Sequence, residues 1–323
     1  MKLAVGFITY NETSAKYLAD FLPSLFKALE FLSSVDYKVL AWDNSESENN
    51  ANRLAVESFN QELALKNANL IKYATRGLNL GFARAYNILM AQAQVVGAEY
   101  FLIINPDTLL EPAAISELVR ALDQNSALVS VSPKILRWDF AARQKTKIID
   151  SCGLILKSGL RFKDLGQGEA DHSQLDQAPI LGPSGAAGLF RLSALGVAPY
   201  FDERFFMYKE DCDLAYRLSL AGQVSRLVPT AIIYHDRTAT TSGAGLWRDL
   251  RSRGQKSRLI RAWSFRNQHF IFVKYWKNQN FVNKLEIVFR ALSMLIFSLI
   301  LEQFLLKQYS YILNPKKVLT NVK

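Results

Sequence analysis

The first half of the chain alternates short apolar runs with amphipathic stretches, and this alternation limits the possible fold more than any other feature. Apolar runs rich in β-branched residues predict strands near residues 3–9, 37–42, 69–74, 99–104 and 127–131. Amphipathic stretches predict helices at about 16–32, 49–66, 83–96 and 112–124. Strands that alternate with helices form βαβ units, in which neighbouring strands are parallel. We therefore expect an α/β fold with an open, mostly parallel sheet flanked by helices.

The pattern loosens after residue 150, where glycines accumulate up to about residue 200. This predicts loops, short strands and a lid, followed by a helix at about 210–222 and a strand at 230–235. The segment Gly182–Gly188 lacks the Lys-Ser/Thr ending of a phosphate-binding loop, so we expect either close backbone packing or a plain loop. A soft boundary at 240–247 predicts a catalytic domain, 1–245, and a C-terminal helical segment, 246–323.

The charge is distributed unevenly. The chain is 50% hydrophobic and 21% charged, which excludes a disordered protein, and its net charge is +10. Residues 1–247 carry 24 Lys and Arg against 26 Asp and Glu, whereas residues 248–323 carry 15 against 3. A neutral body with a basic tail indicates a catalytic domain with an attached anchor for an anionic surface, rather than general nucleic-acid affinity.

Two features predict a cytosolic protein. Cys152 and Cys212 lie far apart, which fits neither a disulfide framework nor a metal-ligand pattern. The apolar start, Met1–Tyr10, is too short for a signal sequence, so we expect it to be the first core strand.

Four polar clusters stand at or just beyond the ends of apolar strands. They are Thr9–Asn11, Asp43–Ser45, Asn79–Asn87 and Asn105–Asp107. Each one alone could be an ordinary turn, because Asn, Asp, Gly and Pro are common at such junctions. Four in successive junctions place carboxylates, amides and an arginine along one edge of the sheet, where a nucleotide would lie.

Asp107 follows a buried strand, and two interpretations compete for it. A divalent cation that bridges phosphates needs one or two such carboxylates and keeps several waters. Alternatively, Asp107 caps the helix that starts near Pro112. We favour the metal-ligand interpretation, because four residues separate Asp107 from Pro112 and make a cap loose.

Glu210 and Asp211 stand between an aromatic run and a helical pattern. The macrodipole favours acids at a helix start, which is one explanation of the pair. A cleft-facing acid at this position could also act as the general base for an attacking hydroxyl. His235 ends an apolar strand, where a histidine is ordinarily a surface or satisfied residue unless other groups draw it to the site.

Taken in order, these motifs resemble the family-two inverting glycosyltransferases of the GT-A fold. The resemblance rests on Thr-Tyr-Asn, Asp-Asn-Ser, Asn-x-Gly-Phe-Ala-x-x-x-Asn, Asn-Pro-Asp-Thr, the glycines around Gly185, Phe-Phe-Met-Tyr-x-Glu-Asp-x-Asp-Leu and the later His235. It covers about residues 3–237 and is greatest for the bacterial rhamnosyltransferase and galactofuranosyltransferase-like branch, in which a loop like Asp164–Asp171 also occurs.

The resemblance implies roles for the motif residues. The nucleotide sugar would be bound by Thr9, Asn11, Asp43, Asn44, Asn79, Gly81, Arg84, Asn87 and Asn105. Asp107 and His235 would hold a divalent metal, Mg²⁺ or Mn²⁺. Asp211, next to Glu210, would be the catalytic base. The family's Asp-x-Asp begins here with Asn105, a weaker ligand, so metal affinity would depend more on the substrate phosphates.

The implied activity is transfer of a sugar, L-rhamnose from dTDP-L-rhamnose, to a hydroxyl of a lipid-linked or growing cell-surface polysaccharide. Two alternatives stay open. A nucleotidyltransferase would carry a glycine-rich basic loop after the first strand, which Thr9–Thr13 is not. A non-catalytic nucleotide-sugar-binding protein is suggested by Asn105.

The tail combines basic and aromatic residues between 248 and 277, which predicts a helix at the surface of an anionic membrane. The apolar run 287–301 falls short of the ~20 residues that span a bilayer, which favours an interfacial or self-associating helix and allows a homo-oligomer. The alternative is a helical cap on the catalytic domain. The tail lacks a recognised nucleic-acid module, so we expect no nucleic-acid partner. The expected location is the cytoplasm, peripheral on the inner face of the cell membrane.

Overall fold

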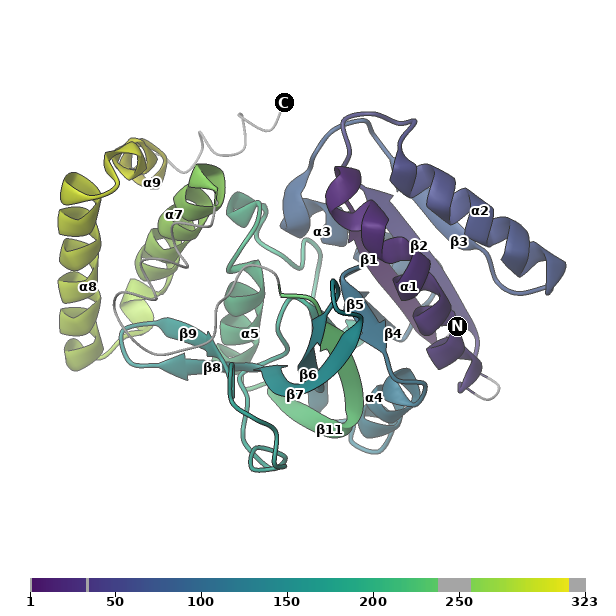
Figure 1. The fold of residues 1–323 in the computed structure, drawn as a ribbon. Coiled ribbons are helices and arrows are strands. Elements are labelled where there is room, and N and C mark those ends of the chain that lie inside the picture. Colours follow the sequence, from purple (N-terminus) through teal and green to yellow (C-terminus); the bar gives the residue numbers. More distant parts are fainter. Residues whose placement is uncertain (1, 33–34, 238–256, 314–323) are drawn as a thin grey trace.

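The computed structural model describes residues 2–32, 35–237 and 257–313. Within these ranges the main feature is a sheet of order β3-β2-β1-β4-β10-β6-β11-β5, with β7 paired to β6 (Figure 1). Its strands are β1 (Leu3–Thr9), β2 (Tyr37–Asp43), β3 (Ile71–Thr75), β4 (Tyr100–Ile104), β5 (Thr108–Leu110), β6 (Leu128–Asp139), β7 (Gln144–Ser151), β10 (Ala187–Arg191) and β11 (Val224–His235). The helices that flank it are α1 (Asn11–Glu30), α2 (Ala51–Leu65), α3 (Gly81–Val95), α4 (Ala114–Asp123) and α5 (Glu210–Leu220).

The alternation of side chains along β1 builds two cores. Leu3, Val5 and Phe7 point to one face of the sheet and pack in a cluster with the apolar side of α1. Ala4 points to the opposite face and packs in a second cluster with Tyr86 of α3. The sheet is therefore covered on both faces, as the βαβ pattern predicted.

Strand direction changes beyond β4. Strands β3, β2, β1 and β4 are parallel to one another, whereas β10 runs antiparallel to both β4 and β6. Because β10 is reversed, its first residues lie beside the last residues of β4, with Ala187 opposite Ile104. The sheet is thus mixed, and this reversal brings the glycine-rich segment 182–188 to the edge where β1, β2 and β4 end.

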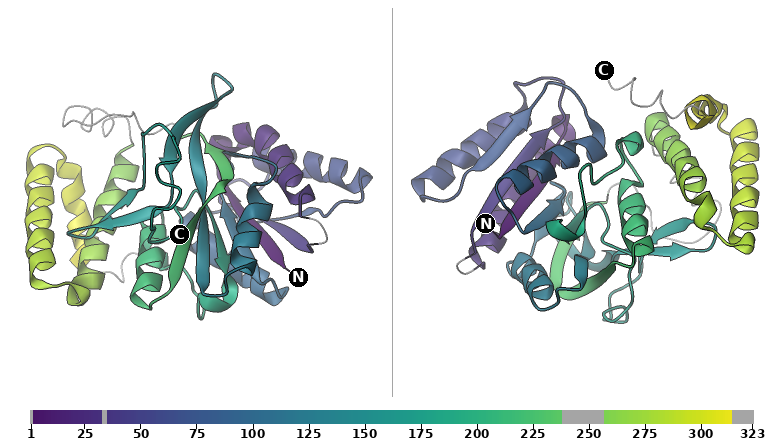
Figure 2. Two further views of the ribbon diagram at one scale, coloured as in Figure 1. Left: turned by 90° about the horizontal axis from the view of Figure 1, so that it is seen from below. Right: turned by 180° about the vertical axis from the view of Figure 1, so that it is seen from behind.

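The C-terminal helices lie at one end of the molecule (Figure 2). They are α7 (Arg258–Tyr275), α8 (Phe281–Ile300) and α9 (Tyr309–Leu313), with the 3₁₀ segment η4 (Gln303–Gln308) before α9. Phe270 and Ile271 of α7 pack in one apolar cluster with Leu160, near the hairpin of β8 (Leu154–Lys157) and β9 (Arg161–Asp164), and with Phe205.

This packing corrects the expected interfacial membrane helix at 248–277. Residues 248–256 lie outside the described part, and most aromatic side chains of α7 are buried against the rest of the protein instead of facing outward. Helix α7 fits the alternative prediction, a helical cap packed on the rest of the protein. The boundary at 240–247 also falls outside the described residues.

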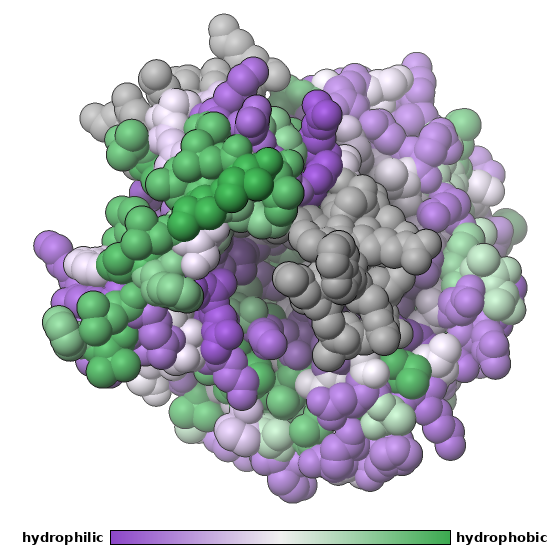
Figure 3. Space-filling view, turned by 60° about the vertical axis from the view of Figure 1, so that its left-hand side comes forward, coloured by the Kyte–Doolittle hydropathy of each residue, from purple (hydrophilic) through white to green (hydrophobic). Residues whose placement is uncertain are grey.

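Helix α8 behaves differently, because its apolar side chains remain exposed. They include Phe281, Leu285, Val288, Phe289, Leu292, Ile296, Leu299 and Ile300. At 3.6 residues per turn these positions fall on one face. Figure 3 shows apolar side chains gathered on the side of the molecule where the C-terminal helices lie. Among the helices that the structure describes, none is long and apolar enough to cross a bilayer.

Candidate active site

One open cavity of about 710 Å³ lies at the edge where the strands end. Its lining includes seven of the residues singled out from the sequence: Asn44, Asn79, Asn105, Asp107, Glu210, Asp211 and His235. These residues come from five separate parts of the chain. The structure therefore brings Asp107 and Asp211, more than a hundred positions apart, to a common cavity.

Asp211 lies in the first turn of α5, and two backbone groups fix its carboxylate. Oδ2 accepts a hydrogen bond from the N–H of Gly185 at 2.9 Å, and Oδ1 accepts one from the N–H of Cys212 at 2.7 Å. A Cβ at Gly185 would stand 3.3 Å from Oδ2, so the glycine permits this close approach. The glycine-rich segment thus packs its backbone against the acid, as one of the two expectations had it.

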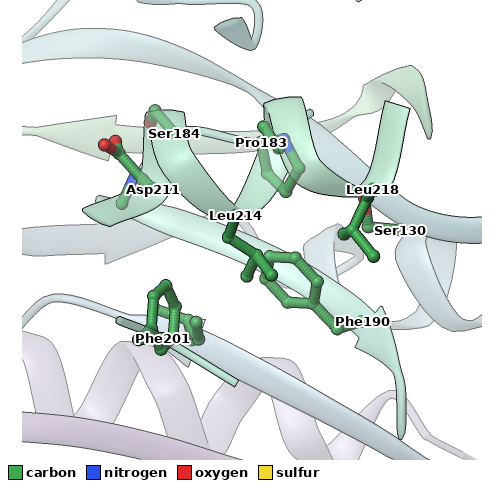
Figure 4. A pocket seen from close by; sticks show the side chains of 11 residues that line it. Ser130, Pro183, Ser184, Phe190, Phe201, Asp211, Leu214 and Leu218 are labelled. Atoms are coloured by element: carbon green, nitrogen blue, oxygen red, sulfur yellow. The ribbon is translucent and has the colours of Figure 1, made fainter. Parts of the chain in front are cut away.

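Apolar packing supports Asp211 from behind. A small void there is lined mainly by apolar side chains, including Phe190, Leu214 and Leu218. Figure 4 shows Asp211 beside Ser184 at one end of this lining, with Leu218 and Ser130 at the other. Helix α5 therefore packs on an apolar core while its first turn faces the cavity.

Glu210 precedes Asp211 and is almost fully buried, with no hydrogen-bond partner at Oε2 among the described atoms. Burial, and then the neighbouring Asp211, raises the pKa of Glu210 well above 4.5. The raised pKa favours the neutral form of Glu210.

Asp107 and His235 face each other across the reversed strand pair β5 and β11. Nε2 of His235 lies 3.3 Å from Oδ2 of Asp107, and Nδ1 lies 2.8 Å from Oδ2 of Asp150. Burial alone would lower the pKa of His235, but the two carboxylates outweigh it and raise the pKa to about 10. The alternative interpretation of Asp107 as a helix cap is wrong, since α4 starts at Ala114 with Ala113 as its N-cap.

The donor set at this point fits a divalent cation that also binds phosphates. Oδ1 of Asp107 is buried and lacks a hydrogen-bond partner in the described structure, and Nε2 of His235, which would release its proton on binding a cation, is next to the same carboxylate. Asp150 holds the other ring nitrogen, as acidic groups commonly do for metal-bound histidines. In the described ranges no three His, Cys, Asp or Glu side chains form a complete metal cluster, so further ligands would come from water and substrate.

The nucleoside side of the predicted site is built around Asp43, which is fully buried. Oδ1 accepts hydrogen bonds from the hydroxyls of Thr9 at 3.0 Å and Ser45 at 2.6 Å. Oδ2 accepts hydrogen bonds from Nδ2 of Asn50 at 2.7 Å and from Oη of Tyr73 at 2.5 Å. Thr9 and Asp43 do not line the cavity, because these protein groups surround the carboxylate. These hydrogen bonds to Asp43 stabilise the ends of β1 and β2.

Asn44 connects this network to the start of α3. Its Nδ2 donates to the carbonyl of Gly81 at 3.1 Å, and its Oδ1 accepts from the N–H of Leu80 at 3.1 Å. Oδ1 of Asn79 accepts from the N–H of Gly81 at 2.9 Å. Asn11 lies outside the cavity lining, and its N–H donates to Oγ of Ser45.

Arg84 and Asn87 contact protein groups outside the cavity lining. Arg84 pairs with Glu203 at 3.9 Å, and Asn87 exchanges hydrogen bonds with the backbone of Phe201. Neither side chain lines the cavity, because the helical turn that carries them faces the segment 201–203. They hold that segment in place, and we leave them out of the proposed binding set.

Sequence reasoning missed several cavity groups. Asp236 and Arg237 follow His235, and Tyr17 of α1 donates to Oδ2 of Asp236 at 2.5 Å. Ile260 and Ser264 of α7 also line the cavity. Asp150 was missed because only the pairing of β6 with β7 brings it to His235.

The fold is that of the GT-A type. The family model described as "Glycosyl transferase family 2" matches residues 4–195, more than half of the chain, and the protein belongs to that family. Membership decides between two of the earlier alternatives, in favour of a glycosyltransferase and against a nucleotidyltransferase.

A curated relative is 27% identical over 198 residues, which cover 53% of this chain and 60% of the relative. It is the N-acetylglucosaminyl-diphospho-decaprenol L-rhamnosyltransferase of Mycobacterium tuberculosis, found in two strains. The chain therefore spans about three fifths of the length of the curated relatives it matches.

Two solved structures share the fold. The crystal structure of GalNAc-T7 with UDP, GalNAc and Mn²⁺ has a TM-score of 0.53 at 12% identity, and covers 83% of this chain and 51% of that one. The mannosyltransferase PcManGT from Pyrobaculum calidifontis, in complex with GDP-Man and Mn²⁺, has a TM-score of 0.50 at 13% identity and covers 98% and 88%.

Proposed function

We propose that this glycosyltransferase transfers a sugar from a nucleoside diphosphate donor with inversion, and that the donor is dTDP-L-rhamnose. The observation that carries the proposal is the single cavity into which Asn44, Asn105, Asp107 and Asp211 all project from distant parts of the chain. The name of the Mycobacterium tuberculosis relative supports rhamnose as the sugar and a lipid-linked diphospho-sugar as the acceptor.

In the proposed reaction Asp211 is the base. Its carboxylate takes the proton of an acceptor hydroxyl while the hydroxyl oxygen forms a bond to the anomeric carbon. The bond from that carbon to the diphosphate oxygen breaks at the same time, and the nucleoside diphosphate leaves with the electron pair. Attack from the opposite side inverts the anomeric centre. The hydrogen bonds from Gly185 and Cys212 orient the carboxylate but leave it lone pairs for the incoming proton.

Asp107 and His235 would hold a divalent cation, with Asp150 orienting the imidazole ring. When bound, such a cation neutralises charge on the departing diphosphate. Asn105 is adjacent to this point, where its amide replaces the carboxylate of the family's usual motif. In the described part of the chain the side chains alone do not complete a coordination shell, so we expect binding of the cation to be coupled to binding of the donor.

The experiment is release of nucleoside diphosphate from a panel of UDP-, GDP- and dTDP-sugars, with a lipid-linked acceptor and with Mg²⁺, Mn²⁺ or EDTA. NMR of the product gives the anomeric configuration. We expect release that requires dTDP-L-rhamnose, acceptor and metal, with inverted product. A panel that yields binding without turnover would instead support a non-catalytic nucleotide-sugar-binding protein.

We also propose that the exposed apolar face of α8 contacts an anionic membrane surface, where a lipid-linked acceptor resides. Two features support this. The face is continuous over the length of the helix, with Phe281, Leu292 and Ile300 at least half exposed. Residues 248–323 carry an excess of twelve positive charges, which complements anionic lipids. A second copy of the chain is the competing occupant.

A further inference from the structure

Helix α7 reaches back to the segment from which the catalytic helix starts. Asn267, at the middle of α7, is fully buried, and its Nδ2 lies within hydrogen-bond distance of three backbone carbonyls. These belong to Phe205 at 3.1 Å, Met207 at 2.8 Å and Tyr208 at 2.8 Å. Glu210 and Asp211 follow in the sequence after Lys209. One side chain of the C-terminal region therefore contacts three backbone carbonyls of the turn that leads into α5.

This turn has a backbone that needs support. Phe206, Tyr208 and Lys209 have positive φ values of 34°, 72° and 69°, although none is a glycine. Residues with a Cβ rarely adopt this region, and such conformations persist only where the surroundings hold them. Lys209 is also the N-cap of α5, and its side chain makes no capping hydrogen bond. The turn is thus held by contacts from outside and not by its own preferences.

The outside contacts come from two sides. From α3, the N–H of Phe82 donates to the carbonyl of Phe206 at 2.6 Å. From α7, the ring of Trp263 packs on the ring of Phe206 with centroids 4.9 Å apart, and Asn267 binds the neighbouring carbonyls. The turn is therefore clamped between the start of α3 on the donor side of the cavity and α7 on the other.

We propose that Asn267 is a positioning residue for Asp211, which makes α7 an integral part of the catalytic site. Asn267 holds the turn 205–209 in the conformation that directs the first turn of α5 into the cavity. Tyr275 extends the same attachment, since its hydroxyl donates to Oδ1 of the buried Asp213 at 2.7 Å. This inference rests on the proposed role of Asp211 as the base.

The test compares Asn267→Ala with Gln268→Ala. Gln268 is the neighbouring buried amide on α7, and its Nε2 donates to the carbonyl of Leu160 at 3.2 Å, away from the turn. Hydrogen exchange followed by mass spectrometry measures the opening of the 205–213 backbone without any substrate. We expect exchange there to be at least ~10-fold faster in Asn267→Ala, and unchanged in Gln268→Ala.

Kinetics then separate positioning from folding. In Asn267→Ala we expect kcat to fall by about 10- to 100-fold while the Kd for nucleoside diphosphate, measured on the same sample, stays within about twofold. If the alanine variant does not fold, Asn267→Ser keeps one donor and should give intermediate values of both quantities. The nucleotide titration also gives the concentration of folded binding sites. Because kcat is calculated per folded site, partial unfolding of the variant does not lower it.

The exchange and kinetic results test different parts of the proposal. Wild-type exchange at 205–213 in Asn267→Ala would overturn the clamp, whatever the enzyme's activity. Faster exchange with an unchanged kcat would overturn the positioning role. If the wild-type protein transfers no sugar at all, the proposed function fails, whereas the exchange measurement still decides whether Asn267 holds the turn.

Discussion

The carboxylate of Asp211 accepts a hydrogen bond from the backbone N–H of Gly185 at 2.9 Å. This contact joins the glycine-rich segment, which enters the reversed strand β10, to the first turn of α5. It leaves the acid in the lining of the cavity that also contains Asp107. The relationship explains why a glycine-rich segment without the features of a phosphate loop accompanies the acidic pair.

Replacement of Asp211 by Asn tests the base directly. The amide keeps the size of the side chain but cannot accept the proton of the acceptor hydroxyl. General-base catalysis typically contributes about 10²- to 10⁴-fold, so we expect kcat to fall by that factor. The Kd for nucleoside diphosphate, measured by calorimetry, should change little. An Asn variant with near wild-type turnover would refute the assignment.

Replacement of Asp107 by Ala tests the cation site. The variant loses the buried oxygen, Oδ1, that has no protein partner in the described structure. We expect Mn²⁺-dependent binding of nucleoside diphosphate to weaken by more than about 10-fold, and Asp150→Asn to weaken it by about 10- to 100-fold through His235. Binding measured in EDTA serves as the control and should not change. Equal affinity of wild type and Asp107→Ala in Mn²⁺ would contradict the ligand role.

Much of the fold could be predicted from local pattern. Strands β1 to β4 and the helices between them lie within a few residues of their predicted positions, because apolar periodicity and buried parallel strands leave a clear signal. The reversal of β10 gave no such signal. It follows a segment rich in glycine, and its direction depends on pairing with β4 and β6.

The site was predicted in part for the same reason. Asp107, Asp211 and His235 lie at strand or helix ends and line the cavity. Arg84 and Asn87 belong to the same motif as Asn79, but helical geometry turns them toward the segment 201–203. A motif in sequence gives proximity along the chain, whereas the side of the helix on which each residue falls depends on its tertiary contacts.

Gly81 tests the packing between α3 and the turn before α5. A Cβ there would come 2.3 Å from the carbonyl oxygen of Phe206, and its φ is +74°. Gly97 has a similar φ of +71° but open space around it. We expect Gly97→Ala to cost about 1 kcal/mol from backbone strain, and Gly81→Ala to cost about 1–3 kcal/mol more from the clash. Urea unfolding of both variants measures the difference. Equal decreases in the free energy of unfolding would show that the turn before α5 can move to accommodate the added methyl group.

The apolar face of α8 is tested by flotation with phosphatidylglycerol vesicles. The variant carries Leu292→Glu and Leu299→Glu, and the control carries Leu54→Glu, a leucine on α2 that is at least as exposed. Each buried leucine contributes roughly 1.5–3 kcal/mol, so we expect the double variant to bind at least ~10-fold less. The control should float like wild type. A wild-type protein that stays at the bottom of the gradient would disprove the membrane proposal, and dimers lost in the double variant would indicate a second copy instead.

The ion pairs of Asp202 lead to a prediction of how the stability of the protein depends on pH. Its carboxylate lies 2.5 Å from Nη2 of Arg204 and 2.8 Å from Nζ of Lys274 of α7. Burial alone would raise the pKa of Asp202, but these two cations outweigh it and hold the pKa well below its usual range. A carboxylate with a lowered pKa stabilises the folded state above its unfolded pKa, near ~4, and this contribution is lost as the pH falls through the folded pKa.

The variant Asp202→Asn removes this contribution. At pH 7 we expect the free energy of unfolding of the variant to be about 1–3 kcal/mol lower than that of wild type, because two charge-assisted hydrogen bonds are lost. The difference should shrink as the pH falls below about 4, because the carboxylate of Asp202 then binds a proton in the unfolded wild-type chain while it stays ionised in the folded one. Urea unfolding at a series of pH values between about 7 and 3 measures both quantities. A gap between wild type and variant that keeps its size over this range would mean that ionisation of Asp202 does not stabilise the attachment of α7.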